Sequence, residues 1–295
     1  MRDQAAMLAQ LVQWAEAEPH VRAMILTSTR ATRAETLDAL SDYDVVLYVD
    51  EPEVFAARND WIDSFGDVLV RFPVYPNKFE WNGLSYFTRM RIYQDGIKID
   101  FTVAPLEELG GSARTGQLRD ELDAGYRVLL DKNGLATNLP QPTYAAYIPR
   151  PPAQQEFDAV VEEFWWETSY VAKNLWRDEL LPAKYSFEVV MKLELLRRVL
   201  EWRVETDHDW SLRPGVLGKM LKRRLDPETW KELESTYVGT DLEANWQALF
   251  ATTALFRRVT LEVAERLGLS YPHQLDQRVS AYLQSIRAMK PKLGR

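Results

Sequence analysis

Apolar residues in the first half of the chain occur in two patterns, at helical spacing or in short continuous runs. Residues 7–14 carry them at helical spacing, so this segment is predicted to be a helix. Runs rich in β-branched and other apolar residues predict strands elsewhere. The predicted strands are residues 22–28, 44–49, 84–93 and 97–103. Because the turn-forming pair Asp95-Gly96 separates the last two, they are expected to form a hairpin.

The second half reads almost entirely as helix. Five of the fifteen prolines lie between residues 140 and 152, where each lacks an amide hydrogen and fixes its own φ. Such a stretch continues neither a helix nor a central strand, so we expect one domain at residues 1–148 and a second at 149–295. Helical patterns then cover residues 154–180, 182–205, 215–237 and 242–267. The predicted fold class is an α+β domain followed by an all-α helical bundle.

Composition narrows the classes of function. The chain has 295 residues, 46% hydrophobic and 27% charged, as in ordinary globular proteins. Without cysteine it can have no thiolate nucleophile, disulfide or cysteine-ligated metal. The formal charge of −8, with no run of like charges, argues against a nucleic-acid partner. Neither a signal peptide nor a long apolar run is found, so we expect a cytoplasmic protein without a membrane partner. The sequence does not determine the oligomeric state, and a monomer is favoured.

Three aspartates are the candidates for chemistry. Asp42 and Asp44 stand two residues apart at the start of a predicted strand, so their side chains point to one face. Asp100 interrupts the apolar strand 97–103, where burial without a partner would be costly. If the two strands are neighbours, the three carboxylates form one cluster suited to Mg²⁺, and phosphoryl or nucleotidyl transfer follows. The alternative is that Asp42 and Asp44 merely cap a turn.

A second feature lies upstream, where strand 22–28 runs into Ser28, Thr29 and Arg30. Hydroxyl groups and backbone amides at a strand-to-helix turn can hold the phosphates of a nucleoside triphosphate. This turn favours the catalytic interpretation of the aspartates over the turn-capping one.

The sequence at these positions resembles a known family, the aminoglycoside 6-adenylyltransferases (streptomycin adenylyltransferases) of the polymerase-β-like nucleotidyltransferase superfamily. The aspartates are shared across that superfamily, whereas other segments are particular to the family. The segments that carry the resemblance are Ser28-Thr29-Arg30, Asp42-Tyr43-Asp44-Val45-Val46, Asp95 to Val103, Glu163-Phe164-Trp165-Trp166, Tyr170 to Lys173, and Leu175 to Leu180. The similarity covers nearly the whole chain, to the final helix around residues 255–258.

The resemblance implies a mixed sheet with flanking helices and an active site in the cleft between this domain and an acceptor-binding helical domain. It implies transfer of AMP from Mg·ATP to a hydroxyl of an aminoglycoside such as streptomycin, with release of pyrophosphate. Asp42, Asp44 and Asp100 would bind Mg²⁺, and Asp100 would also orient the acceptor hydroxyl. Ser28 and Thr29 would touch the ATP phosphates, with Arg30 beside them. Members of this family are associated with antibiotic resistance.

Two positions depart from the family pattern. The phosphate turn is usually Gly-Ser-Arg, and here Ser28 stands where the family has glycine. Some members have an Asp, taken as general base, at the position of Tyr185, and Glu188 lies one helical turn further on the same face. Glu188 is therefore a candidate base or else a surface acid, and Lys173 is a candidate phosphate contact or else a surface charge.

Two other functions remain open: transfer to a different hydroxyl compound, and a catalytically impaired homologue that only binds a nucleotide or a cationic ligand. The distribution of charge bears on the acceptor. Residues 1–150 hold 22 acidic and 15 basic side chains, and residues 151–295 hold 22 and 21. An acidic first half favours a polycationic acceptor such as an aminoglycoside.

Overall fold

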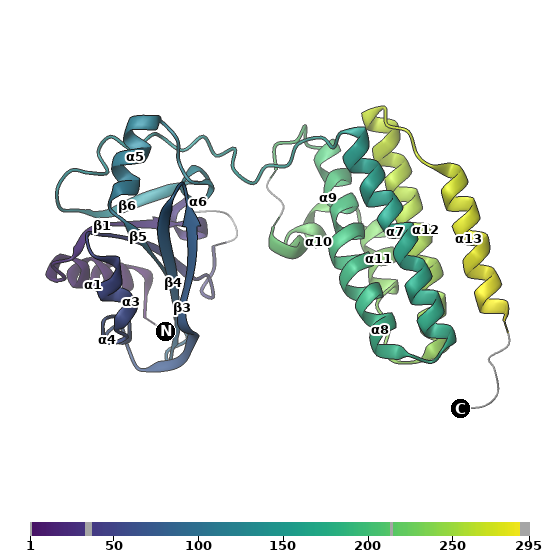
Figure 1. The fold of residues 1–295 in the computed structure, drawn as a ribbon, viewed down its shortest axis with the longest axis horizontal. Coiled ribbons are helices and arrows are strands. Elements are labelled where there is room, and N and C mark those ends of the chain that lie inside the picture. The colour runs from purple at the N-terminus through teal and green to yellow at the C-terminus, as the bar shows by residue number, and fades with distance from the viewer. Residues whose placement is uncertain (1, 33–36, 213–214, 290–295) are drawn as a thin grey trace. The chain divides into compact units, whose positions relative to one another are not determined.

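A computed structural model describes residues 2–32, 37–212 and 215–289. The chain divides into two compact units, Met1–Tyr147 and Ile148–Arg295. The first unit is built on a sheet and the second is helical (Figure 1). The α+β fold with a C-terminal helical region, predicted from the sequence, is confirmed.

The first unit contains a six-stranded mixed sheet in the order β3-β4-β5-β2-β1-β6. Its strands are β1 (Val21–Thr27), β2 (Tyr43–Val49), β3 (Val68–Trp81), β4 (Leu84–Tyr93), β5 (Lys98–Pro105) and β6 (Tyr126–Asp131). Strands β2 and β5 are parallel, and the other neighbours are antiparallel. The predicted hairpin is present as β4 and β5.

Both faces of the central strands are buried, which explains their continuous apolar runs. Val45 and Leu47 of β2 belong to one buried cluster, and Val46 and Tyr48 belong to another on the opposite face. The first face packs against α1 (Gln4–Ala17), α3 (Pro52–Ala57) and α4 (Asp60–Asp63). The second packs against α5 (Glu107–Thr115) and α6 (Asp120–Asp123). A short helix, α2 (Ser28–Thr32), follows β1 directly.

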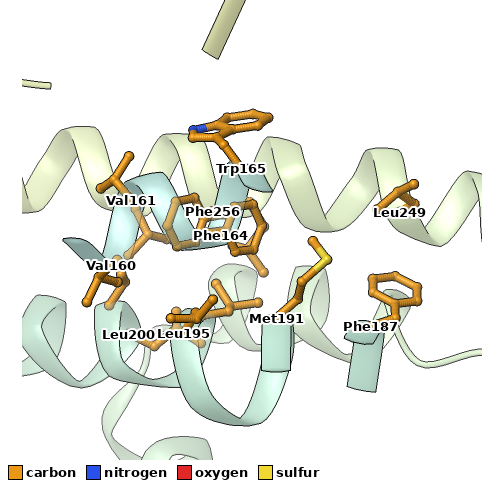
Figure 2. Close-up of a cluster of buried hydrophobic side chains, with 14 of the residues drawn as sticks. Val160, Val161, Phe164, Trp165, Phe187, Met191, Leu195, Leu200, Leu249 and Phe256 are labelled. Atoms are coloured by element: carbon orange, nitrogen blue, oxygen red, sulfur yellow. The ribbon is translucent and has the colours of Figure 1, made fainter. Parts of the chain in front are cut away.

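The second unit is a bundle around one buried cluster. Its elements are α7 (Gln154–Trp176), α8 (Leu180–Lys184), the π-helix η1 (Tyr185–Leu196), α9 (Arg197–Thr206), the 3₁₀ turn η2 (Val216–Gly218), α10 (Leu221–Arg224), α11 (Pro227–Ser235), α12 (Leu242–Leu267) and α13 (His273–Ala288). Figure 2 shows Phe164 of α7 against Phe256 of α12 inside this cluster. Their rings are stacked with centroids 3.5 Å apart.

The predicted helix 242–267 is present with its start and end, because Asp241 caps the first turn and Gly268 takes a left-handed φ of 67° after the last. The prediction of one helix over 215–237 is wrong, since the segment breaks into η2, α10 and α11. Asp226 caps a new helix whose first residue is Pro227, and proline cannot continue a preceding helix.

Strands β3 and β6, the short helices α3 to α6 and the helix α13 were not predicted. Much of β3 is exposed, it contains Pro73 and Pro76, and its pairing with β4 shifts between Phe72 and Asn77. An edge strand of this kind has no need of alternating apolar residues. None of the described helices combines the length and apolar character needed to cross a lipid bilayer.

Candidate active site

The two strand aspartates stand side by side in the sheet. Asp44 of β2 is the register partner of Asp100 of β5, and because the strands are parallel their side chains share a face. Asp42 lies two residues before Asp44 and one residue before the start of β2. The neighbouring strands on which the predicted carboxylate cluster depended are therefore present.

An unpredicted residue, Lys98, joins this cluster. Its Nζ donates to Asp42 Oδ2 at 2.6 Å and to Asp100 Oδ2 at 2.8 Å. Lys98 is two residues before Asp100, so the strand period places both side chains on the same face. That spacing is visible in the sequence and could have identified the lysine.

Burial and like charge shift the protonation of the cluster. Burial first, and then the nearby Asp100 carboxylate, raise the pKa of Asp44 from 3.8 to about 6. Burial also raises the pKa of Asp100, although the bond from Lys98 opposes the shift. Burial alone would lower the pKa of Lys98, but its bonds to Asp100 and Asp42 outweigh this and raise it. The cluster therefore holds more negative charge than it can easily keep without a further cation.

The donor set fits a hard divalent cation. Asp100 Oδ1 is buried and has no hydrogen-bond partner, and the three carboxylates supply the oxygen ligands that Mg²⁺ prefers. The oxygens are not yet gathered: within the part of the chain that the structure describes, only His20, Asp50 and Glu51 have ligand atoms all within 4.8 Å of one another. That exposed group lies at the other end of β1 and β2.

The phosphate turn has the backbone that a glycine would allow. Ser28 has a φ of 60°, in the left-handed region that most side chains avoid. Its side chain hydrogen-bonds to Asp44, and this bond partly offsets the rise in the pKa of that carboxyl. The serine thus keeps the turn conformation and ties it to the carboxylate cluster. Thr29 follows it, partly exposed, in α2.

Arg30 is turned toward the protein rather than left free beside the turn. It is buried, and its guanidinium donates to the carbonyl oxygens of Ser41 and Asp42 at 2.6 to 3.0 Å. It also lies over the Tyr43 ring, 4.0 Å from the centroid. Arg30 therefore fixes the backbone that carries Asp42.

A fourth carboxylate, Glu121 of α6, reaches the same end of the sheet. Its Oε1 accepts a hydrogen bond from Thr27 Oγ1 at 2.9 Å, and its Oε2 lies 3.0 Å from the guanidinium of Arg119. Glu121 also adds to the rise in the pKa of Asp44. No sequence pattern connects Glu121 to this site, since only the fold of α6 over the sheet brings it here.

The other two candidates, Glu188 and Lys173, lie in the helical unit. Both oxygens of Glu188 accept from Lys192 at 2.9 and 3.1 Å, and Lys184 donates to it at 3.0 Å. Lys192 is buried, and burial lowers its pKa to about 8. Lys173 of α7 lies 4.9 Å from the centroid of the exposed Tyr170 ring. Glu188 is thus one member of an ion-pair cluster and not a solvated surface acid.

A mixed sheet with carboxylates on adjacent parallel strands, beside a hydroxyl-bearing strand-to-helix turn, has the features of a nucleotidyltransferase. The family model of streptomycin adenylyltransferase matches residues 1–286, so the chain belongs to that family, which is a family of nucleotidyltransferase enzymes.

The chain is also similar to individual proteins over nearly its whole length. The aminoglycoside 6-adenylyltransferase of Bacillus subtilis (strain 168) is 29% identical over 287 residues, covering 97% of this chain and 98% of the relative. The Campylobacter jejuni enzyme of the same name is 29% identical over 294 residues, covering 96% of this chain and 95% of the relative. Among solved structures, the chain is similar to the crystal structure of an aminoglycoside 6-adenyltransferase from Bacillus subtilis, at 25% identity and a TM-score of 0.46. The similarity covers 98% of this chain and 100% of the other.

Proposed function

We propose that this protein transfers AMP from Mg·ATP to a hydroxyl of an aminoglycoside such as streptomycin and releases pyrophosphate. The observation that carries the proposal is the cluster of Asp42, Asp44 and Asp100, with Asp44 and Asp100 in register on parallel strands. The printed names of the relatives support an aminoglycoside as acceptor.

Asp42, Asp44 and Asp100 would hold Mg²⁺. The metal would neutralise the triphosphate and polarise the phosphorus that is attacked. Ser28 and Thr29 would bind the phosphates through hydroxyl and amide groups, and the left-handed turn at Ser28 suits this close approach. Asp100, with one oxygen free of any hydrogen bond, would orient the acceptor hydroxyl and accept its proton as the hydroxyl attacks.

The helical unit would bind the acceptor. The family-specific segments around Trp166 and Tyr170 lie on α7, where these two side chains are exposed and their rings meet edge to face with centroids 6.1 Å apart. The acidity of the first unit would favour a polycation over a polyanion in the same reaction.

Mass spectrometry of an aminoglycoside panel after incubation with ATP and Mg²⁺ tests the proposal. We expect one aminoglycoside to gain the mass of AMP and one pyrophosphate to appear per product. Asp42→Asn and Asp44→Asn should abolish both signals with the fold kept, whereas the exposed Asp67→Asn should not.

Three results would contradict parts of the proposal. An active Asp42→Asn or Asp44→Asn variant would remove the metal role of these residues. ATP binding without any adenylylated aminoglycoside would mean a different hydroxyl acceptor. Calorimetric binding of an aminoglycoside without ATP binding would mean a catalytically impaired protein.

A further inference from the structure

Lys98 makes its two shortest contacts with oxygens of the predicted metal ligands. Its ammonium bonds to Oδ2 of Asp42 and Oδ2 of Asp100, at 2.6 and 2.8 Å. A Mg²⁺ ion binds carboxylate oxygens at about 2.0 to 2.1 Å. Because two cations repel each other at such short range, Lys98 and a metal ion would compete for these oxygens.

The lysine satisfies only part of the cluster. Lys98 donates to Asp42 and Asp100 but not to Asp44, and Asp100 Oδ1 is buried without a hydrogen-bond partner. One ammonium therefore stands against three carboxylates. A divalent ion would neutralise more of this charge than the lysine does.

The ammonium has room to leave. Lys98 also lines a cavity of about 400 Å³, whose other lining residues include Asp3, Asp38 and Ser41. These acceptors offer the ammonium other polar partners, and Arg2 and Arg30 line the same cavity. Rotation of its flexible side chain into the cavity would free Asp42 and Asp100 to turn toward a shared ion.

We propose that Lys98 is a resident counter-ion of the active site, which holds Asp42 and Asp100 in the metal-free protein and is displaced when the metal binds. The inference rests on the proposed function, because it takes the three aspartates to be the metal ligands. Its consequence is that Lys98 stabilises the metal-free fold and weakens metal affinity.

The test compares Mn²⁺ binding, by calorimetry on the full chain without nucleotide, for the wild type, Lys98→Met, Lys98→Gln and Lys98→Arg. Lys98→Arg keeps the charge, and Lys98→Gln keeps a hydrogen-bond donor without it. Lys78→Met is the matched control, since Lys78 lies on β3 and pairs with Glu53 at 3.6 Å. Thermal unfolding in chelator and in Mn²⁺ gives a second readout that does not depend on activity.

We expect Lys98→Met and Lys98→Gln to bind Mn²⁺ roughly tenfold more tightly than the wild type, a change of the size that one adjacent charge produces at a carboxylate. In chelator, both variants should unfold at a lower temperature than the wild type. Adding Mn²⁺ should raise their unfolding temperature by more than it raises that of the wild type. Lys98→Arg and Lys78→Met should resemble the wild type. Should Lys98→Met fail to fold, Lys98→Gln carries the comparison.

Equal Mn²⁺ affinity in the wild type and the uncharged variants would overturn the counter-ion role and leave the metal site intact. Absence of Mn²⁺ binding in the wild type and in every variant would overturn the metal site itself. The proposed competition between Lys98 and the metal ion would then fail as well. Binding in the uncharged variants alone would support the displacement. In the Lys98→Met background, Asp100→Asn should recover part of the lost stability, because it removes one unpaired carboxylate.

Discussion

Asp44 combines burial with two acidic neighbours in the cluster, and the pH dependence of stability follows from its pKa. The folded-state value of about 6 lies above the unfolded value of 3.8. A group whose pKa is raised on folding contributes stability below its unfolded pKa, and that contribution is lost as the pH rises through its folded pKa. In the metal-free protein, ionised Asp44 therefore destabilises the fold near neutral pH.

We predict that Asp44→Asn is inactive and yet more stable than the wild type at pH 7 in chelator, by on the order of 1 kcal/mol. The gain should shrink between pH 6 and pH 4, since the wild-type carboxyl becomes protonated in the folded state. Urea unfolding across this range measures it, with Asp67→Asn as the exposed control. A gain that stays constant with pH would contradict the assignment of the raised pKa to Asp44.

The contacts of Arg30 indicate that it positions the backbone that carries Asp42, in addition to its predicted contact with the phosphates. A second prediction follows from these contacts. Arg30→Met removes donors to the carbonyl oxygens of Ser41 and Asp42 and should cost about 1 to 3 kcal/mol of stability. Without this support Asp42 is less well placed, so kcat should fall more than KM for ATP rises. Arg30→Lys should recover little, because one ammonium cannot replace the planar fork.

Steady-state kinetics separates the two roles of Arg30. A large rise in KM for ATP with kcat unchanged would mean that the guanidinium binds the phosphates. Loss of kcat at unchanged KM would mean that it acts through Asp42.

At the scale of elements, the π-helix η1 is held by Glu188, Lys184 and Lys192. Lys192 is buried and also donates to the carbonyl oxygen of Thr236 at 2.6 Å, while Lys184 donates to that of Val238 at 2.8 Å. The cluster therefore connects η1 to the segment that follows α11. The three side chains stand four residues apart, a spacing that brings side chains together on one face of a helix.

For Glu188→Gln we expect a loss of about 1 to 3 kcal/mol in the helical unit, because buried Lys192 loses its counter-charge. The rate should change little, whereas loss of a general base would lower it by roughly 10² to 10⁴. Glu194→Gln, at an exposed position of the same π-helix, is the matched control. Denaturation and kcat, measured together, decide between a structural role and the predicted role as base.

Sequence pattern predicted the elements with buried faces and failed where burial is partial. Residues 43–49 are apolar because both faces of β2 are covered, and the segment was recognised for that reason. β3 is an exposed edge strand without the alternation that a one-sided core imposes, so it was missed. The break at Pro227 followed from a cap and a proline, which the helical periodicity of residues 215–237 concealed.

At the scale of the whole molecule, each unit has buried clusters of its own. Two clusters cover the faces of the sheet within residues 7–139, and a third joins the helices from Phe157 to Ile286. A unit of this size with a complete core can fold alone.

We therefore predict that residues 1–147, expressed alone, unfold cooperatively and keep the Mn²⁺ affinity of the full chain. The fragment should not adenylylate any aminoglycoside, because the proposed acceptor-binding unit is missing. Circular dichroism and calorimetry check the first two expectations, with the Asp42→Asn fragment as the control for metal binding. A fragment that stays unfolded would contradict the independence of the two cores.

The sequence by itself determined the class of fold and the family and singled out three aspartates as candidate ligands, because buried runs, proline clusters and the D-x-D spacing are local features. Tertiary structure decided which of these residues meet. The parallel pairing of β2 with β5 sets Asp44 beside Asp100, and it brings Lys98 between Asp42 and Asp100. The pKa of Asp44 and the placement of Glu121 likewise follow from burial and proximity between distant segments, which no local pattern encodes.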